Sequence, residues 1–164
     1  MRSRTVPLPL AAAPAPSPVT VVLADSHPLM RRSLRRLLEA NGDIRVVAEA
    51  GDLPLTAQHV AGHRPDVLVL DLGMRDGSSL AMIRELHERT PRLAIIATAL
   101  EDSPGFARRA IGAGATRFLA KETADTALPR AVLDAAGAAA QAAGQEDRSQ
   151  RRAARERIRG VAPR

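Results

Sequence analysis

The chain has 164 residues, a length that suits one domain of about 100 to 150 residues with extra segments at its ends. It contains two phenylalanines and no tryptophan, tyrosine or cysteine. This composition excludes disulfides, cysteine nucleophiles and thiolate zinc sites, and it leaves almost no aromatic surface for stacking on nucleic acid bases or flavins. No apolar stretch approaches the roughly 18 residues of a membrane span.

The net charge of +6 comes from the two ends of the chain. Residues 1–4 contain two arginines, and residues 146–164 contain seven arginines against three acids. The body between them carries fifteen basic and fifteen acidic side chains, so it is neutral. A neutral body does not predict a folded DNA-binding face, because such a face needs clustered basic residues.

Residues 1–18 begin with two arginines and continue as a stretch rich in proline and alanine. The basic start resembles that of a signal peptide, but the prolines would break the helix that an apolar signal core forms. We therefore expect a disordered leader.

From residue 19 to residue 134 a short apolar run, a polar turn and a stretch of helical spacing follow one another repeatedly. The third and fourth runs are apolar almost throughout, which is typical of strands covered on both faces. The second run alternates more and is a better candidate for an edge strand. The predicted strands cover residues 19–24, 44–50, 66–70, 93–98 and 116–120.

Amphipathic stretches separate these strands and predict helices, several of which open beside a proline, as at Pro28 and Pro104. Pro129 lies too deep for a comfortable first turn, so we expect a kink or a late start in the last helix. Strands alternating with helices predict an α/β fold, in which a parallel sheet carries helices on both faces. The predicted helices cover residues 28–40, 53–62, 78–90 and 103–112, and the last begins near residue 123.

Polar side chains stand where four of the predicted strands end. Asp25 and Ser26 follow the first strand, Asp71 the third, Thr98 ends the fourth, and Lys121, the only lysine of the chain, follows the fifth. The carboxyl ends of parallel strands share one edge, and ligands bind there where the strand order reverses. Two carboxylates with Mg²⁺, a hydroxyl and an ammonium can hold a phosphoryl group, and an aspartate can itself become an acyl phosphate.

The segments VVLADSHPLMRRSLRRLLEA, RPDVLVLDLGMRDG, IIATAL and AIGAGATRFLAKE occur in this order. With them the chain resembles, from about residue 19 to about residue 137, the receiver domain of two-component response regulators. The subgroup it is most similar to usually carries a LuxR-type helix-turn-helix domain behind the receiver. This resemblance implies a flavodoxin-like (βα)5 doubly wound parallel sheet with strand order 2-1-3-4-5.

The resemblance also implies roles for single residues. A histidine kinase would phosphorylate Asp71, Thr98 and Phe118 would form the switch pair, and Lys121 would contact the phosphoryl group. The implied protein is a cytoplasmic phosphoprotein of phosphorelay signal transduction and not an enzyme. Its output would be contact with a downstream protein or a second copy, through the face formed by the fourth and fifth strands.

The chain departs from the family pattern at the cation site. The family has two adjacent acids after the first strand, and the second of them is usually the direct Mg²⁺ ligand. In this chain Ser26 replaces that second acid. Asp25, Asp71 and the backbone carbonyl of Gly73 remain as expected ligands, with Ser26 contributing weakly or through water, so we expect weak Mg²⁺ binding. Arg75 also replaces a usual proline.

Other interpretations of these polar residues are open or less favoured. Ser26 fits a turn or a helix cap ahead of Pro28 as well as it fits a metal contact. A hydrolase dyad of Ser26 and His27 is disfavoured, because neighbours on an extended segment point to opposite sides and no G-x-S-x-G turn is present. The four histidines show no clear metal-ligand array, since His59 and His63 lack a third ligand, and a solvated helix face is favoured for them.

We expect three segments: the leader at 1–18, the receiver domain at 19–137, and an Ala/Arg-rich tail at 138–164 without an effector domain. The tail is too short and too poor in apolar residues for a helix-turn-helix domain. A disordered or frayed Arg-rich helix is favoured for it over a nucleic-acid contact, so direct DNA binding and a membrane partner are not expected. The alternatives to a phosphorylated receiver are a pseudo-receiver that binds without phosphorylation and the remnant of a DNA-binding regulator.

Overall fold

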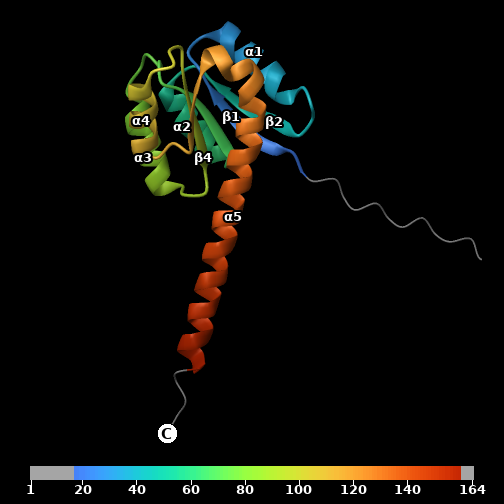
Figure 1. The fold of residues 1–164 in the computed structure, drawn as a ribbon, viewed down its shortest axis with the longest axis vertical. Coiled ribbons are helices and arrows are strands. Elements are labelled where there is room, and N and C mark those ends of the chain that lie inside the picture. Colours follow the sequence, from blue (N-terminus) through green and yellow to red (C-terminus); the bar gives the residue numbers. More distant parts are fainter. Residues whose placement is uncertain (1–16, 160–164) are drawn as a thin grey trace, which may run out of the picture.

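The computed structural model describes residues 17–159, without the side chains of residue 125 and residues 154–159. The predicted leader therefore lies almost wholly outside the described residues. A parallel sheet is sandwiched between two layers of helices (Figure 1). Its strands are β1 (Val19–Ala24), β2 (Ile44–Ala50), β3 (Val67–Asp71), β4 (Ala94–Ala99) and β5 (Arg117–Ala120).

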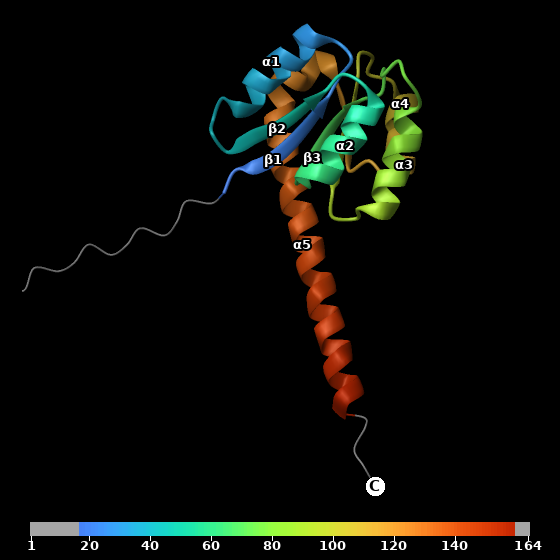
Figure 2. The same ribbon diagram turned by 180° about the vertical axis from the view of Figure 1, so that it is seen from behind.

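The strand order is β2-β1-β3-β4-β5, which confirms the predicted doubly wound fold and the edge position of the second strand. The crossovers run through helices on both faces of the sheet; in Figure 2, α2 lies in front of the sheet and α5 behind it. The helices are α1 (Pro28–Glu39), α2 (Leu53–His63), α3 (Ser79–Arg89), α4 (Pro104–Gly112) and α5 (Ala124–Arg159), with a 3₁₀ turn, η1 (Lys121–Thr123), before α5.

Two apolar cores form because successive strand residues point to opposite faces of the sheet. Val21 and Leu23 of β1 belong to the core under α1 and α5, whereas Val22 and Ala24 belong to the core under α2, α3 and α4. Every residue of β3 is buried. Each fully buried Val or Leu side chain contributes about 1.5–3 kcal/mol of transfer free energy, so the central strands are a rigid base for the residues that follow them.

The helices begin where the sequence places caps and prolines. The Asp52 carboxylate accepts a hydrogen bond from Leu55 N at 2.7 Å at the start of α2, and the Ser78 hydroxyl accepts one from Ala81 N at 3.2 Å at the start of α3. Each bond satisfies a backbone N–H that the first turn of a helix otherwise leaves unpaired. Ser103 is the N-cap of α4, although its side chain makes no capping bond.

Pro129 led us to expect a kink or a late start in the last helix; the late start is wrong, because α5 begins at Ala124 and contains Pro129. Since Pro129 stands early in the helix, its missing N–H leaves only the bond to the carbonyl of residue 125 unmade. Packing of α5 on the sheet offsets this loss, because Leu128 and Val132 are fully buried in the core.

The second half of α5 leaves the domain and projects away from the sheet (Figure 1). Ala139 is the last residue of the helix that packs against the core. The predicted tail boundary at residue 137 thus falls inside α5, close to the point where the helix loses contact with the sheet. Of the two states predicted for the tail, the described part is helical as far as Arg159. No helix of the described chain is long and apolar enough to cross a membrane.

Candidate functional site

The topology brings two acids to one crevice. Asp25 directly follows β1 and Asp71 is the last residue of β3. These two strands are neighbours, and the chain continues from them toward opposite edges of the sheet, so the crevice at their carboxyl ends is the switch point of the fold. Both acids are buried, with exposed fractions of 1% for Asp25 and 3% for Asp71.

A single lysine joins the two acids. The Lys121 ammonium, supplied by η1, lies 2.6 Å from Asp25 Oδ2 and 3.0 Å from Asp71 Oδ2. Its side chain is 2% exposed, and a buried charge of this kind is tolerated only when it is paired. Two carboxylates and one ammonium leave a net negative charge in the crevice, which favours a further cation.

Asp71 is held from the loop that follows β3. Gly73 N donates to Asp71 Oδ1 at 3.1 Å, and the buried Ser79 hydroxyl donates to the Asp71 carbonyl at 2.9 Å. A Cβ atom added to Gly73 would lie 3.3 Å from Asp71 Oδ2, which is closer than an ordinary contact. Glycine at this position therefore lets the backbone pass close to the carboxylate.

Thr98 is the neighbour of Asp71 in the sheet. The two residues are partners across β3 and β4, and the Thr98 carbonyl accepts a hydrogen bond from Leu72 N at 2.7 Å. Among the described residues, no hydrogen bond joins the Thr98 hydroxyl to Asp71. Phe118 lies farther away, half-buried in the core under α2, α3 and α4. The structure thus brings Asp25, Asp71 and Lys121 into contact, sets Thr98 beside them, and places Phe118 in the core.

Ser26 is half-buried, and its hydroxyl lies 3.4 Å from His27 Nδ1. The N-cap of α1 is His27 and not Ser26, and it makes no side-chain capping bond. The structure therefore does not show Ser26 as the helix cap, which was one of its two possible roles.

Among the four histidines, His27 lies in a group of candidate metal ligands, which the sequence did not indicate. Ligand atoms of Asp25, His27 and Asp71 all lie within 4.8 Å of one another. The carboxylate of Asp25 accepts a hydrogen bond from His27 N at 2.8 Å, and His27 Nδ1 lies 3.2 Å from the same oxygen. An aspartate often bonds to the backbone two residues later in a turn, so the spacing of Asp25 and His27 is a signal that sequence reasoning missed.

A partly buried arginine, Arg31, holds the backbone of Asp25. Arg31 Nη1 donates to the Asp25 carbonyl, and Arg31 Nε lies 3.6 Å from Glu49 Oε2. The Arg31 side chain also passes beside Gly51, where an added Cβ atom would make an ordinary contact of 3.5 Å with Arg31 Nη1. Glu49 also pairs with Arg35 at 2.8 Å. Side-chain hydrogen bonds to Glu49, and then to Glu39, raise the pKa of Arg35 above its ordinary value.

The donor set of the crevice fits a divalent cation. Asp25 and Asp71 offer two buried carboxylates, and Mg²⁺ in proteins commonly takes one or two carboxylates and completes its shell with water and phosphate. Ser26 adds no charge to this set. The crevice can therefore hold a cation and a phosphoryl group close to the Asp71 carboxylate.

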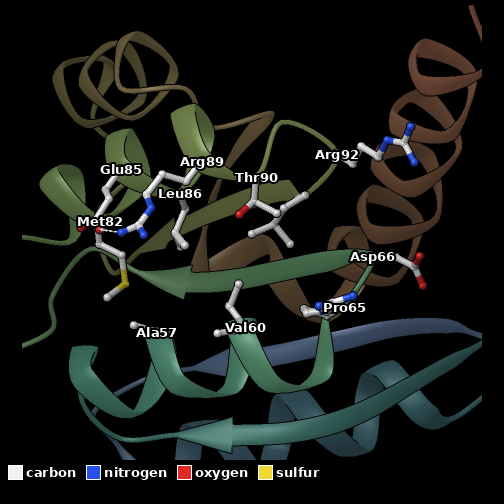
Figure 3. Close-up of a pocket in the computed structure, with 13 residues that line it drawn as sticks. Ala57, Val60, Pro65, Asp66, Met82, Glu85, Leu86, Arg89, Thr90 and Arg92 are labelled. Atoms are coloured by element: carbon white, nitrogen blue, oxygen red, sulfur yellow. Dashed lines mark hydrogen bonds and ion pairs between the residues drawn. The ribbon is translucent and has the colours of Figure 1, made fainter. Parts of the chain in front are cut away.

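A separate hollow of about 860 Å³ lies at the amino ends of β3 and β4, the opposite edge of the sheet. Met82 and Leu86 of α3 face Val60 of α2 across it (Figure 3). Glu85 and Arg89 in its lining pair with each other at 2.8 Å. Its lining mixes apolar side chains with exposed charged ones, so it offers none of the buried acid chemistry of the strand ends.

Comparison with known proteins relates the chain to signalling proteins. The family model described as the response regulator receiver domain matches residues 21–133. The chain is 36% identical over 120 residues to the probable transcriptional regulatory protein NarL of Mycobacterium tuberculosis, covering 72% of this chain and 55% of that protein. It is 37% identical over 116 residues to the DNA-binding transcriptional activator DevR/DosR of the same species, covering 71% and 54%. The chain thus spans about half the length of the curated relatives that it matches.

Solved structures agree with this relation. The signal receiver domain of the putative response regulator NarL from Mycobacterium tuberculosis matches with a TM-score of 0.71 and 31% identity, over 74% of this chain and 98% of that one. The isolated receiver domain of RcsB from Salmonella enterica serovar Typhimurium, solved with the phosphomimetic BeF3−, matches with a TM-score of 0.65 and 25% identity, over 71% and 86%.

Proposed function

The chain belongs to the response regulator receiver family, and on that premise we propose that a histidine kinase phosphorylates it on Asp71. The observation that carries the proposal is the contact of one buried ammonium with two buried carboxylates, Lys121 with Asp25 and Asp71. Proteins of this family are generally signalling proteins and not enzymes, and a cytoplasmic location is part of the proposal.

The chemistry follows from the positions of these side chains. An Asp71 carboxylate oxygen attacks the phosphorus of a phosphohistidine, the phosphorus–nitrogen bond breaks, and the released imidazole takes up a proton. The Lys121 ammonium lies beside the acceptor and neutralises charge on the transferred group. Asp25 and Asp71 would hold Mg²⁺, with the Gly73 carbonyl and water as further ligands, and when bound this ion neutralises phosphoryl oxygens.

The output we propose is a changed interaction surface around β4, β5 and α4. Thr98 is the strand partner of Asp71 and would move toward the phosphoryl group, with Phe118 of β5 adjusting behind it. Two large apolar side chains are exposed in this region, Leu100 after β4 at 61% and Ile111 of α4 at 50%. Such side chains suit contact with a downstream protein or with a second copy of the chain.

The names of the relatives NarL and DevR/DosR refer to regulation of transcription. Those proteins are about twice as long as the region that they share with this chain. The shared region is the receiver domain, which would supply the phosphorylation switch and not the DNA contact. A pseudo-receiver without phosphorylation is less favoured, because Lys121 contacts both Asp25 and the acceptor Asp71.

The proposal is tested with a small-molecule phosphodonor and a divalent cation. We expect the native protein to gain the mass of one phosphoryl group as an acid-labile adduct, and we expect Asp71→Asn to gain none. Asp102→Asn is the matched control, because Asp102 is an exposed acid outside the crevice. A native protein that stays unmodified at high Mg²⁺ concentration would contradict the proposal.

A further inference from the structure

His27 stands at the mouth of the crevice, with its ring beside a buried acid. The hydrogen bond from His27 N to Asp25 Oδ1, at 2.8 Å, folds the backbone so that Nδ1 lies 3.2 Å from that oxygen. The His27 side chain is 49% exposed, whereas Asp25 is 1% exposed. The imidazole is therefore accessible to solvent, whereas the carboxylate beside it is buried.

The spacing of these atoms suits two ligands of one metal ion. Two ligands at right angles, each about 2.1 Å from a metal, are about 3 Å apart, and His27 Nδ1 and Asp25 Oδ1 are 3.2 Å apart. The whole group of Asp25, His27 and Asp71 lies within 4.8 Å, slightly beyond the roughly 4.2 Å between opposite ligands at the same bond length. A small side-chain rotation therefore closes the set around an ion.

Lys121 does not occupy this side of Asp25. Its ammonium contacts Oδ2 of both acids, whereas His27 lies at Oδ1 of Asp25. The same carboxylate can thus keep its lysine through one oxygen and bind an ion through the other.

We propose that His27 Nδ1 is a ligand of the cation held by Asp25 and Asp71, so that this crevice favours a first-row transition-metal dication such as Mn²⁺ or Co²⁺ over Mg²⁺. The proposal rests on the proposed function in that it takes the crevice as a cation site. Mg²⁺ strongly prefers oxygen ligands, whereas imidazole suits the later first-row metals. Ser26 supplies no carboxylate to restore an all-oxygen set, and its hydroxyl lies toward the histidine ring.

The test is calorimetric titration of the full chain, freed of metal by a chelator, with Mg²⁺, Mn²⁺ and Co²⁺ in turn. Transition metals bind most nitrogen and oxygen sites more tightly than Mg²⁺ does. The informative quantity is therefore the change in the affinity for each metal when the imidazole is removed. We expect His27→Gln to weaken Co²⁺ binding by about tenfold or more, the scale on which lost metal-site partners act, and to leave Mg²⁺ binding within about twofold. His59→Gln removes a histidine of α2 and should change neither affinity.

A second measurement needs no variant. Mn²⁺ is paramagnetic, so in the native protein it should broaden the imidazole resonances of His27 before those of His59, His63 and His87. Equal Co²⁺ affinity of native protein and folded His27→Gln, or an unbroadened His27 resonance at saturating Mn²⁺, would overturn the proposal. Phosphorylation of Asp71 with Mg²⁺ as the only dication would continue in that case, so failure of this inference and failure of the proposed function are distinguishable.

Discussion

At the scale of single residues, the crevice depends on Lys121 to keep two buried acids compatible. Its ammonium contacts both Asp25 and Asp71, and all three side chains are almost fully buried. Like charges this close repel strongly in a low-dielectric interior, so the cation between them stabilises the fold as well as the site.

Lys121→Met removes the ammonium and keeps an unbranched apolar chain. Because removal of one partner leaves buried charges uncompensated, we expect the free energy of unfolding to fall by about 3–5 kcal/mol. Urea denaturation in metal-free buffer measures this change. Adding Asp25→Asn to Lys121→Met should recover part of the loss, because it removes one of the two repelling charges. A single variant as stable as the native protein would show that the ion pairs do not hold the site together.

Gly73→Ala probes the close passage of the backbone beside the acceptor. The new Cβ atom would lie 3.3 Å from Asp71 Oδ2, so we expect slower phosphorylation by a small phosphodonor with a change in stability of no more than about 1 kcal/mol. Gly62→Ala in α2 is the control, because its Cβ atom meets nothing within 4 Å. It should leave the phosphorylation rate unchanged and stabilise the helix by about 0.5–1 kcal/mol. Equal rates for native protein and Gly73→Ala would contradict this argument.

The sequence predicts part of this site and misses the rest for a physical reason. Asp25, Asp71 and Lys121 are predictable, because each follows a strand and the carboxyl ends of parallel strands share an edge. The place of His27 is only partly predictable, since alternation along an extended segment puts it on the same side as Asp25 but does not give the distance between its ring and the carboxylate. The turn that Asp25 makes with His27 N sets that distance, because it folds the backbone and brings the ring beside the carboxylate.

At the scale of helices and strands, local signals predict where elements begin better than how far they continue. Pro28 and Pro104 mark helix starts that the structure confirms. The extent of α5 beyond residue 137 is less predictable, because its alanines favour a helix while no apolar stripe shows what it packs against.

Pro129→Ala tests what the proline costs α5. The substitution restores an N–H that can donate to the carbonyl of residue 125, a change worth up to about 3 kcal/mol. Alanine also frees the unfolded chain, which opposes the gain by about 0.4–1 kcal/mol. We therefore expect the free energy of unfolding to rise by about 1–2 kcal/mol, as measured by urea denaturation. A loss of stability would instead mean that the helix requires the proline at this point.

At the scale of the whole molecule, the order of the strands is the feature that spacing alone could not supply. Alternating apolar runs and helical stretches predict a parallel sheet, but they allow several orders of its strands. The order 2-1-3-4-5 came from the resemblance to receiver domains, and the structure confirms it. This order makes β1 and β3 neighbours, so it is the reason that Asp25 and Asp71 meet at all.

The molecule also separates into a neutral domain and a basic extension. Ala139 is the last residue of α5 in contact with the core, and residues 146–164 carry seven arginines against three acids. Any attraction for nucleic acid should therefore belong to the extension, and the phosphorylation chemistry should belong to the domain. Interactions with a phosphate backbone weaken steeply as salt rises, which distinguishes them from sequence-specific contacts.

Deleting residues 146–164 tests this separation of roles. Among the described side chains, Ala139 is the last of α5 that packs against the core, so we expect the melting temperature to change by no more than about 2 °C and phosphorylation of Asp71 to proceed at the native rate. Labelled duplex DNA is followed by fluorescence anisotropy at several salt concentrations: any binding by the full chain should be weak and salt-dependent, and it should be absent after the deletion. Substituting Arg148, Arg151 and Arg152 with glutamine in the full chain keeps the helix and removes charge, so it should reproduce the loss. DNA binding that survives both changes would assign the contact to the domain itself, against its balanced charge.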